Sequence, residues 1–190
     1  RFILRWAALL HDTGKPEAKY YDEAADKCRF GGHPEISARI AEDVLTRLKF
    51  SNADKSEIVE LVKYHDHVDT HDARIRAFAA QHSREYIIKL SKLKDADTKA
   101  HVADKVAKYR KDKEYFIAKS LGFIDDGTAI LPKDLNIDGN DLLAMGFTGV
   151  QIGKFYEHVY MNCLGEPKNN CKEWLLKQAA KFLAKSKRAE

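Results

Sequence analysis

The sequence has 190 residues, of which 44% are hydrophobic and 33% charged. These values are typical of a soluble protein with one hydrophobic core, or with one core and a smaller appendage. No stretch approaches the roughly 18 consecutive apolar residues of a membrane-spanning helix. The apolar N-terminal run is too short for a signal peptide and ends in His11 and Asp12. We therefore expect a cytoplasmic protein without a membrane partner.

The net charge of +4 is concentrated near the C-terminus. Residues 168–190 contain seven lysines or arginines and two glutamates, so the rest of the chain is close to neutral. A basic segment of this kind is a candidate phosphate-contacting face. The alternative is a solvated helix that carries lysines on its outer side.

The predicted elements are almost all helices. Hydrophobic periodicity and capping residues predict them, in chain order, over 2–11, 34–49, 54–67, 72–81, 83–97, 100–120, 138–145, 149–164 and 170–187. Asp54 or Ser56 is the expected cap of the third helix and Asp72 that of the fourth. Residues 13–32 are expected to be irregular, and residues 128–131 carry a strand pattern that is too weak to predict a strand.

The turn-rich residues 122–132 mark the best candidate boundary along the chain. The sequence therefore predicts an all-α fold, with a larger helical domain over 1–121 and a smaller helical domain over 122–190. The chain starts with Arg1 rather than Met, inside a predicted helix. From this we expect a piece of a longer protein.

The strongest candidate site is the adjacent pair His11 and Asp12, which ends the first predicted helix just before a break at Gly14. The last carbonyls of a helix lack partners within it, so both side chains can turn from the helix end toward a cation. An imidazole nitrogen and a carboxylate oxygen suit zinc, manganese, iron, nickel or magnesium, with positions left open for water. The alternative is a hydrogen-bonded pair at a helix end.

Further candidate ligands follow at the start or end of other predicted helices. His33 begins the second helix after two glycines, His65 lies near the end of the third, and Asp95 and Asp97 lie near the end of the fifth. A bundle can bring helix ends together without straining any helix. For His33 the alternative role is helix capping or packing.

Residues 7–16, 30–33 with Ser37, and 62–66 have the order, spacing and helical setting of one known family. Because of these motifs, the segment 2–100 resembles the HD superfamily of metal-dependent phosphohydrolases. The resemblance implies that His11 and Asp12 are metal ligands. It also implies that Asp97 is the late aspartate ligand, with Asp95 as the alternative.

The same resemblance implies roles for three further residues. His33 and His65 would either bind a second metal ion or support the ligands of the first, and Lys15 would stand near the substrate phosphate. The family's first histidine ligand lies about one helical hairpin before the His-Asp pair, so we expect it upstream of Arg1.

This residue set implies hydrolysis of a phosphate ester. A divalent ion activates water and polarises a phosphoryl oxygen. Asp12, Lys15 and His33 are the expected catalytic residues: Asp12 would hold the ion, Lys15 would offset phosphate charge and His33 would transfer a proton.

A second resemblance covers residues 131–188. The pattern from Leu131 through Asp138 and Asp141 to the glycine-flanked turn at Gly146 and Gly149 is similar to the C-terminal region of the tRNA nucleotidyltransferase/poly(A) polymerase family. The turn precedes a helix whose first N–H groups are able to bind a nucleic-acid phosphate. A packing turn between two helices is the alternative.

The catalytic head of that family, with its strand aspartates, is not among these residues. The resemblance implies a helical body that grips tRNA through the Lys-rich segments 105–113 and 172–188, with Lys177, Lys181 and Lys185 as RNA-binding residues. Two functions remain open at this point. One is a metal-dependent phosphohydrolase or cyclic phosphodiesterase acting on nucleotides or RNA ends. The other is a non-catalytic RNA-binding body with a vestigial site.

Overall fold

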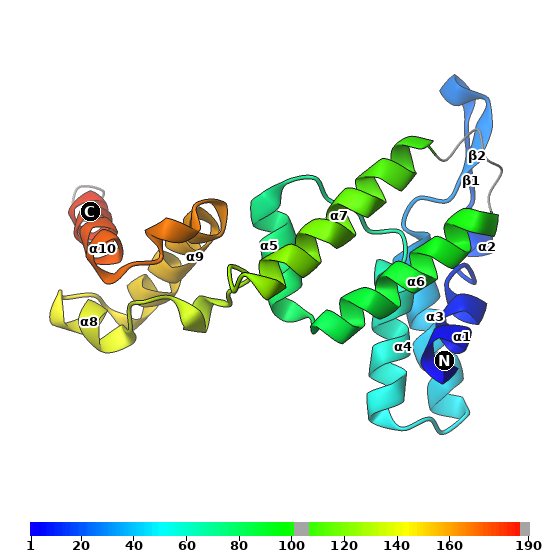
Figure 1. Ribbon diagram of the computed structural model, residues 1–190, viewed down its shortest axis with the longest axis horizontal. Helices are drawn as coiled ribbons and strands as arrows, with labels where there is room; N and C mark the ends of the chain where they lie inside the picture. The colour runs from blue at the N-terminus through cyan, green and yellow to red at the C-terminus, as the bar shows by residue number, and fades with distance from the viewer. Residues whose placement is uncertain (101–106, 187–190) are drawn as a thin grey trace. The chain divides into compact units, whose positions relative to one another are not determined.

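The computed structural model describes residues 1–100 and 107–186 and confirms an all-α fold (Figure 1). Its helices are α1 (Phe2–Leu10), α2 (Lys15–Ala18), α3 (His33–Arg47), α4 (Asn52–Tyr64), α5 (Asp72–Gln81), α6 (Arg84–Ala100), α7 (Ala107–Asp125), α8 (Gly139–Ala144), α9 (Gly149–Gly165) and α10 (Lys172–Ser186). Each corresponds to a predicted helix, except the short α2. The start of the helix predicted over 100–120 and the end of that predicted over 170–187 lie outside the described residues.

Two of the expected caps were wrong. Ser51, not Asp54 or Ser56, caps α4, because its hydroxyl accepts a hydrogen bond from the backbone N–H of Asp54 at 3.1 Å. Asp72 is already inside α5, and its carboxylate accepts hydrogen bonds from Tyr115 and Lys119.

The segment expected to be irregular contains a short β-hairpin. Strands β1 (Tyr20–Asp22) and β2 (Lys27–Arg29) pair antiparallel, with Tyr20 opposite Arg29. Asp26 supplies the left-handed conformation in the turn, with a φ of 48°. Figure 1 shows the hairpin projecting beyond the neighbouring helices. Three-residue strands are too short to give a readable alternation pattern, which is why the sequence did not predict them.

The chain divides into two compact units. Unit 1 comprises residues 1–68 and 85–114, and unit 2 comprises residues 69–84 and 115–190. Each unit thus draws on two separate stretches of sequence. The division into domains at residue 122 stays a prediction.

The core of unit 1 lies where α1, α3 and α4 pack together. Ala7, Leu45, Ile58, Leu61 and Val62 are fully buried there, at the helical spacing that the sequence shows. His11, His33 and His65 each lie at an end of one of these three helices. Packing of the apolar faces therefore brings three histidine-bearing helix ends to one place.

Gly14 lets the chain after α1 approach the start of α3. A Cβ at this position would lie 2.6 Å from the backbone nitrogen of Ser37 and 2.7 Å from the carbonyl oxygen of His33. The Gly14 N–H also donates to the Ser37 hydroxyl at 2.9 Å. Only glycine fits this backbone contact, which holds the Asp12 turn against His33.

We expect Gly14→Ala to lower the free energy of unfolding by about 1–3 kcal/mol, because a methyl group must be forced between two backbones. Urea denaturation followed by circular dichroism measures the change. Gly122→Ala is the control: Gly122 lies inside α7, a Cβ there meets nothing within 4 Å, and alanine is the better helix former. A Gly14→Ala variant as stable as Gly122→Ala would contradict the close contact.

Unit 2 is built around an apolar cluster contributed mainly by α8, α9 and α10. Leu142, Phe155, Val159 and Leu175 are fully buried in it. Arg76 of α5 contacts two other elements of this unit. Its guanidinium donates to the carbonyl oxygen of Leu164 at 2.6 Å and lies 4.0 Å from the ring centroid of Phe123.

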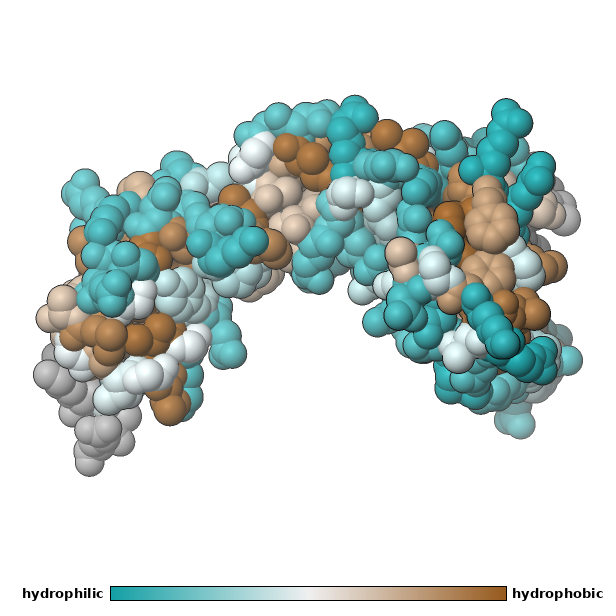
Figure 2. All heavy atoms as spheres, turned by 90° about the horizontal axis from the view of Figure 1, so that it is seen from below, coloured by the Kyte–Doolittle hydropathy of each residue, from teal (hydrophilic) through white to brown (hydrophobic). Residues whose placement is uncertain are grey.

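Hydrophilic side chains cover most of the surface visible in Figure 2, and apolar side chains reach it in separate patches. No helix among the described residues is both long and apolar enough to cross a membrane.

Candidate metal centre

His11 lies between two carboxylates at the C-terminal end of α1. Its Nδ1 donates to the carbonyl oxygen of Ala8 at 2.8 Å. Its Nε2 lies 3.2 Å from Oδ2 of Asp12 and 3.3 Å from Oδ1 of Asp97. Hydrogen bonds to these carboxylates raise the pKa of His11 to about 10. Without a metal ion His11 is therefore protonated at neutral pH, and its positive charge lies between the two carboxylates.

Asp12 joins this pair to the two other histidines of the site. Its Oδ2 accepts a hydrogen bond from Nζ of Lys15 at 2.6 Å. Its Oδ1 is buried, has no hydrogen-bond partner among the described residues, and lies 3.3 Å from Nε2 of His33 and 3.7 Å from Nε2 of His65. Burial by itself would raise the pKa of Asp12, but the hydrogen bonds from His11 and Lys15 outweigh it and lower the pKa. Asp12 is thus ionised throughout the physiological range.

His33 and His65 face each other inside the site. Nδ1 of His33 donates to the carbonyl oxygen of Phe30 at 2.9 Å, and Nδ1 of His65 donates to that of Val62 at 2.6 Å. With both Nδ1 atoms protonated, two Nε2 lone pairs point at each other across 3.2 Å. Burial lowers the pKa of His65. Two Nε2 lone pairs in this arrangement repel each other unless a proton or a metal ion lies between or beside them.

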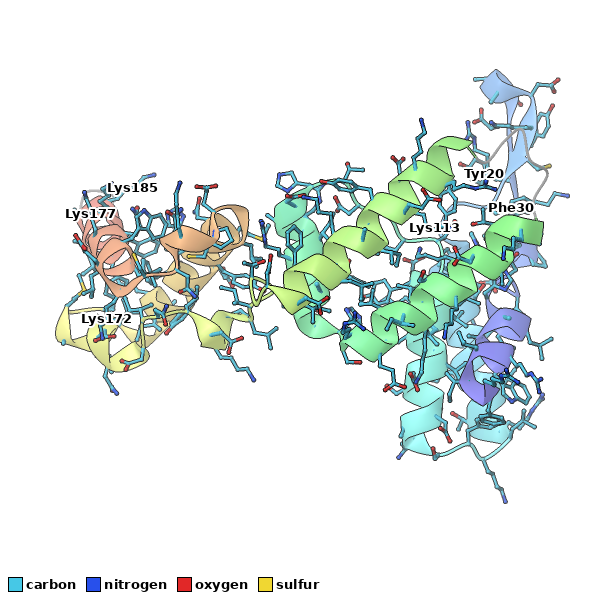
Figure 3. All side chains as sticks on the ribbon, viewed as in Figure 1. Tyr20, Phe30, Lys113, Lys172, Lys177 and Lys185 are labelled. Carbon is cyan, nitrogen blue, oxygen red and sulfur yellow. The ribbon has the colours of Figure 1, made fainter. Side chains whose placement is uncertain are left out.

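The structure separates the two candidate aspartates of α6. Asp97 contacts His11, as described above. The carboxylate of Asp95 instead accepts a hydrogen bond from Nζ of Lys113 at 2.6 Å, and Lys113 is buried between α6 and α7 (Figure 3). Asp97, rather than Asp95, belongs to the cluster.

Two sets of side chains offer ligand atoms within 4.8 Å of one another. The first is His11, Asp12 and His65, and the second is His33, His65 and Asp66. Asp66 was not expected in the site, although its position next to His65 at a helix end was an available signal. The residues fit a divalent cation: imidazole Nε2 atoms and an ionised carboxylate converge, and Oδ1 of Asp12 is the buried atom that a cation would satisfy.

Lys94 binds the backbone next to the site. Its side chain is fully buried, and Nζ donates to the carbonyl oxygens of His65 at 2.7 Å and His67 at 2.6 Å. Burial lowers its pKa to about 7. Lys94 thus fixes the backbone that carries His65, a role that the sequence did not reveal.

An open pocket of about 630 Å³ leads to the cluster. Its walls include Asp12, Lys15, His33 and His65, together with residues of the hairpin. The predicted residues His11, Asp12, Lys15, His33, His65 and Asp97 therefore lie together in unit 1.

The predicted RNA-binding lysines belong to unit 2, whereas this site belongs to unit 1. Lys177, Lys181 and Lys185 are exposed on α10 at four-residue spacing, and so on one side of the helix (Lys177 and Lys185 are labelled in Figure 3). Of the other Lys-rich segment, 105–113, residues 105 and 106 lie outside the described residues. Lys113 is buried against Asp95 and is not available to RNA.

In unit 1 the ends of several helices bring histidines and aspartates together beside an open pocket. This arrangement places the protein in the class of candidate metal-binding domains. The family model described as "HD domain" matches residues 1–109. The chain belongs to the HD domain family.

Two relatives are tRNA nucleotidyltransferases. The chain is 38% identical over 99 residues to the A-adding tRNA nucleotidyltransferase of Deinococcus radiodurans, a match that covers 52% of this chain and 23% of that protein. It is 39% identical over 61 residues to the CC-adding tRNA nucleotidyltransferase of Thermus thermophilus, covering 32% of this chain and 14% of that protein. The matched part thus spans less than a quarter of either relative. No solved structure gave a significant match.

Proposed function

We propose that unit 1 binds a divalent metal ion and hydrolyses phosphate esters of nucleotides or RNA ends. One observation carries the proposal: the buried, unpaired Oδ1 of Asp12 faces Nε2 of both His33 and His65, while Oδ2 faces His11. Hydrogen bonds to backbone carbonyls hold all three rings with Nε2 toward the same carboxylate.

Each of these side chains has a distinct role in the proposal. His11, Asp12 and Asp97 hold the ion, and His33 and His65 either complete its coordination or hold a second ion. An ion held there supplies a Lewis acid that activates water and polarises a phosphoryl oxygen. Lys15, already beside Asp12, offsets charge on the phosphate, and His33 transfers a proton. Mixed imidazole and carboxylate donors suit manganese, iron, nickel or zinc, and leave magnesium as a weaker candidate.

Metal binding should release a proton. The pKa of His11 is raised to about 10, whereas Asp12 is already ionised and burial keeps His65 neutral. A metal ion must therefore displace the proton of His11. We expect the metal affinity to rise roughly tenfold per pH unit from about pH 7 toward 10.

Calorimetric titration with Mn²⁺ in two buffers of different ionisation enthalpy measures this release. About one proton per ion is expected, and His11→Gln should abolish it. An affinity that is independent of pH, with no proton released, would reject His11 as a ligand.

We propose a second function for unit 2, namely binding to the body of tRNA. The similarity to two tRNA nucleotidyltransferases and the exposed lysines of α10 support it. On this view the chain is the HD and C-terminal part of a tRNA nucleotidyltransferase-like protein.

Neutralising Lys177, Lys181 and Lys185 together to glutamine should weaken tRNA binding by about 10–100-fold, because each phosphate contact releases counterions. Affinity should also fall steeply with salt, with a shallower slope in the triple variant. Filter binding over a range of KCl concentrations provides both values. Lys172→Gln is the comparison, since Lys172 is already paired with Asp141 at 2.7 Å. Equal affinity and equal salt dependence in all proteins would count against this function.

A further inference from the structure

The β1–β2 hairpin presents two chemically different faces. Residues directly opposite each other in an antiparallel pair lie on one face, and so do residues two positions apart along a strand. The register pairs Tyr20 with Arg29 and Asp22 with Lys27, and it pairs Tyr21 with Cys28. Tyr20, Lys27 and Arg29 therefore share one face, and Tyr21 lies on the other.

The face with Tyr20, Lys27 and Arg29 forms a wall of the pocket that leads to the candidate metal centre. All three line that pocket, as do Asp12, His33 and His65. Cys28, which pairs with Tyr21, also lines it, whereas Tyr21 does not. Phe30, which follows the hairpin, also lines it. In Figure 3 Tyr20 and Phe30 lie near each other at the base of the hairpin.

The aromatic part of this wall is close to the site and open to solvent. The ring of Tyr20 lies over the backbone of Gly31, at 3.6 Å from where a Cβ would be, yet Tyr20 is 52% exposed. The ring of Phe30 has Nζ of Lys15 at 6.0 Å from its centroid, and the same Nζ contacts Asp12. A ligand that reaches from Asp12 past Lys15 therefore meets aromatic rings next.

The polar part of the wall consists of Lys27 and Arg29, and the charge of Arg29 is offset by Asp22. Lys27 and Arg29 are exposed, and the guanidinium of Arg29 is oriented by the carboxylate of Asp22. Aromatic rings beside lysine and arginine suit a ligand with both a stacking face and a phosphate.

From this we infer that Tyr20, Lys27 and Phe30 recognise a nucleoside monophosphate unit, with the base against the rings and the phosphate between Lys27 and Lys15. This inference rests on the proposed function, because it concerns the same pocket. It adds the residues that select a nucleotide over a phosphate ester without a base. The unit comes either from a free nucleotide or from the end of an RNA chain.

Equilibrium binding to the full chain, kept free of metal with EDTA so that no ester is hydrolysed, tests the inference without relying on turnover. Calorimetry compares adenosine 5′-monophosphate with ribose 5-phosphate, which lacks the base. The wild-type protein should bind the nucleotide at least tenfold more tightly. Tyr20→Ala and Phe30→Ala should each remove most of this difference and leave the affinity for ribose 5-phosphate unchanged. Lys27→Gln should weaken both ligands alike.

Tyr21→Ala is the matched control. Tyr21 is adjacent in sequence, is 57% exposed, and lies on the opposite face of the same strand, so its removal should leave nucleotide affinity within twofold of wild type. Equal losses in Tyr20→Ala and Tyr21→Ala would overturn the inference, because hairpin integrity rather than stacking would then explain both. Equal affinity of the wild-type protein for the two ligands would overturn it as well.

The two sources of the ligand, and the two proposals, separate in the same experiment. A short oligoribonucleotide with a 3′-phosphate is titrated in parallel. If the unit is an RNA end, the affinity for this oligonucleotide should fall in Tyr20→Ala. If the unit is a free nucleotide, only the affinity for the free nucleotide should fall. Tyr20-dependent nucleotide binding without hydrolysis of any ester supports the inference and rejects the proposed hydrolase. Hydrolysis with no preference for nucleotides supports the hydrolase and rejects the inference.

Discussion

Asp12→Ala should lower metal affinity by at least about 100-fold and reduce metal-dependent phosphatase activity to background. Among residues 1–100 and 107–186, Asp12 is the carboxylate that faces all three histidines of the site. Even residues that only orient ligands are worth about 10–100-fold in metal affinity. Atomic absorption after dialysis measures the bound metal, and release of phosphate from nucleotides measures the activity. Phosphatase activity that survives both Asp12→Ala and chelation would contradict a metal-dependent mechanism.

The two aspartates of α6 provide an internal control for this prediction. Asp97→Asn should reproduce much of the loss, since Asp97 contacts His11. Asp95→Asn should retain metal binding, because Asp95 is paired with Lys113 instead. If both substitutions weakened metal binding equally, a general effect on α6 rather than ligation would be the explanation.

Lys94→Ala should lower the free energy of unfolding by about 3 kcal/mol or more. The substitution leaves two carbonyl oxygens without the donor that the fully buried amino group supplies, and an unsatisfied buried group costs about 1–3 kcal/mol. It also leaves a cavity. Because one of these carbonyls belongs to His65, metal affinity should fall as well. Urea denaturation and metal titration measure the two effects.

Lys94→Met and Lys92→Ala separate the causes. Methionine keeps most of the volume, so Lys94→Met should be less destabilising than Lys94→Ala, by the cost of the cavity. Lys92 lies on the same helix and is exposed, and its removal should change stability by less than about 0.5 kcal/mol. A Lys94→Ala protein with the stability of Lys92→Ala would show that the buried amino group contributes nothing.

The helices and the cluster at their ends could be predicted because both depend on local patterns. Apolar spacing predicts each helix and its buried face, and the motif around His11, Asp12, His33 and His65 lies at the ends of those helices. Packing of the apolar faces then brings these helix ends together, so residues that are spaced along the sequence lie in one cluster in the fold. The family match over residues 1–109 agrees with that motif.

The features that could not be predicted depend on contacts between distant segments. Lys94 has the sequence surroundings of a surface lysine, between Leu93 and Asp95, and only the packing of α6 against the end of α4 buries it. The hairpin has strands of three residues, too short for an alternation pattern. Lys113 lies in a basic run but is buried in an ion pair with Asp95. In each case tertiary packing outweighs local composition.

The bonds from the three histidine Nδ1 atoms to backbone carbonyls also bear on how the domain would respond to the loss of an ion from the proposed site. Each ring is held by the chain itself, and the apolar core beneath the site, with Leu10, Leu61 and Val62 buried, is complete without a cation. A structural zinc site differs, because there the metal supplies the folding energy and its removal unfolds the domain. In the proposed site the side chains are already oriented by the chain, so we expect an ion bound there to exchange while the domain stays folded.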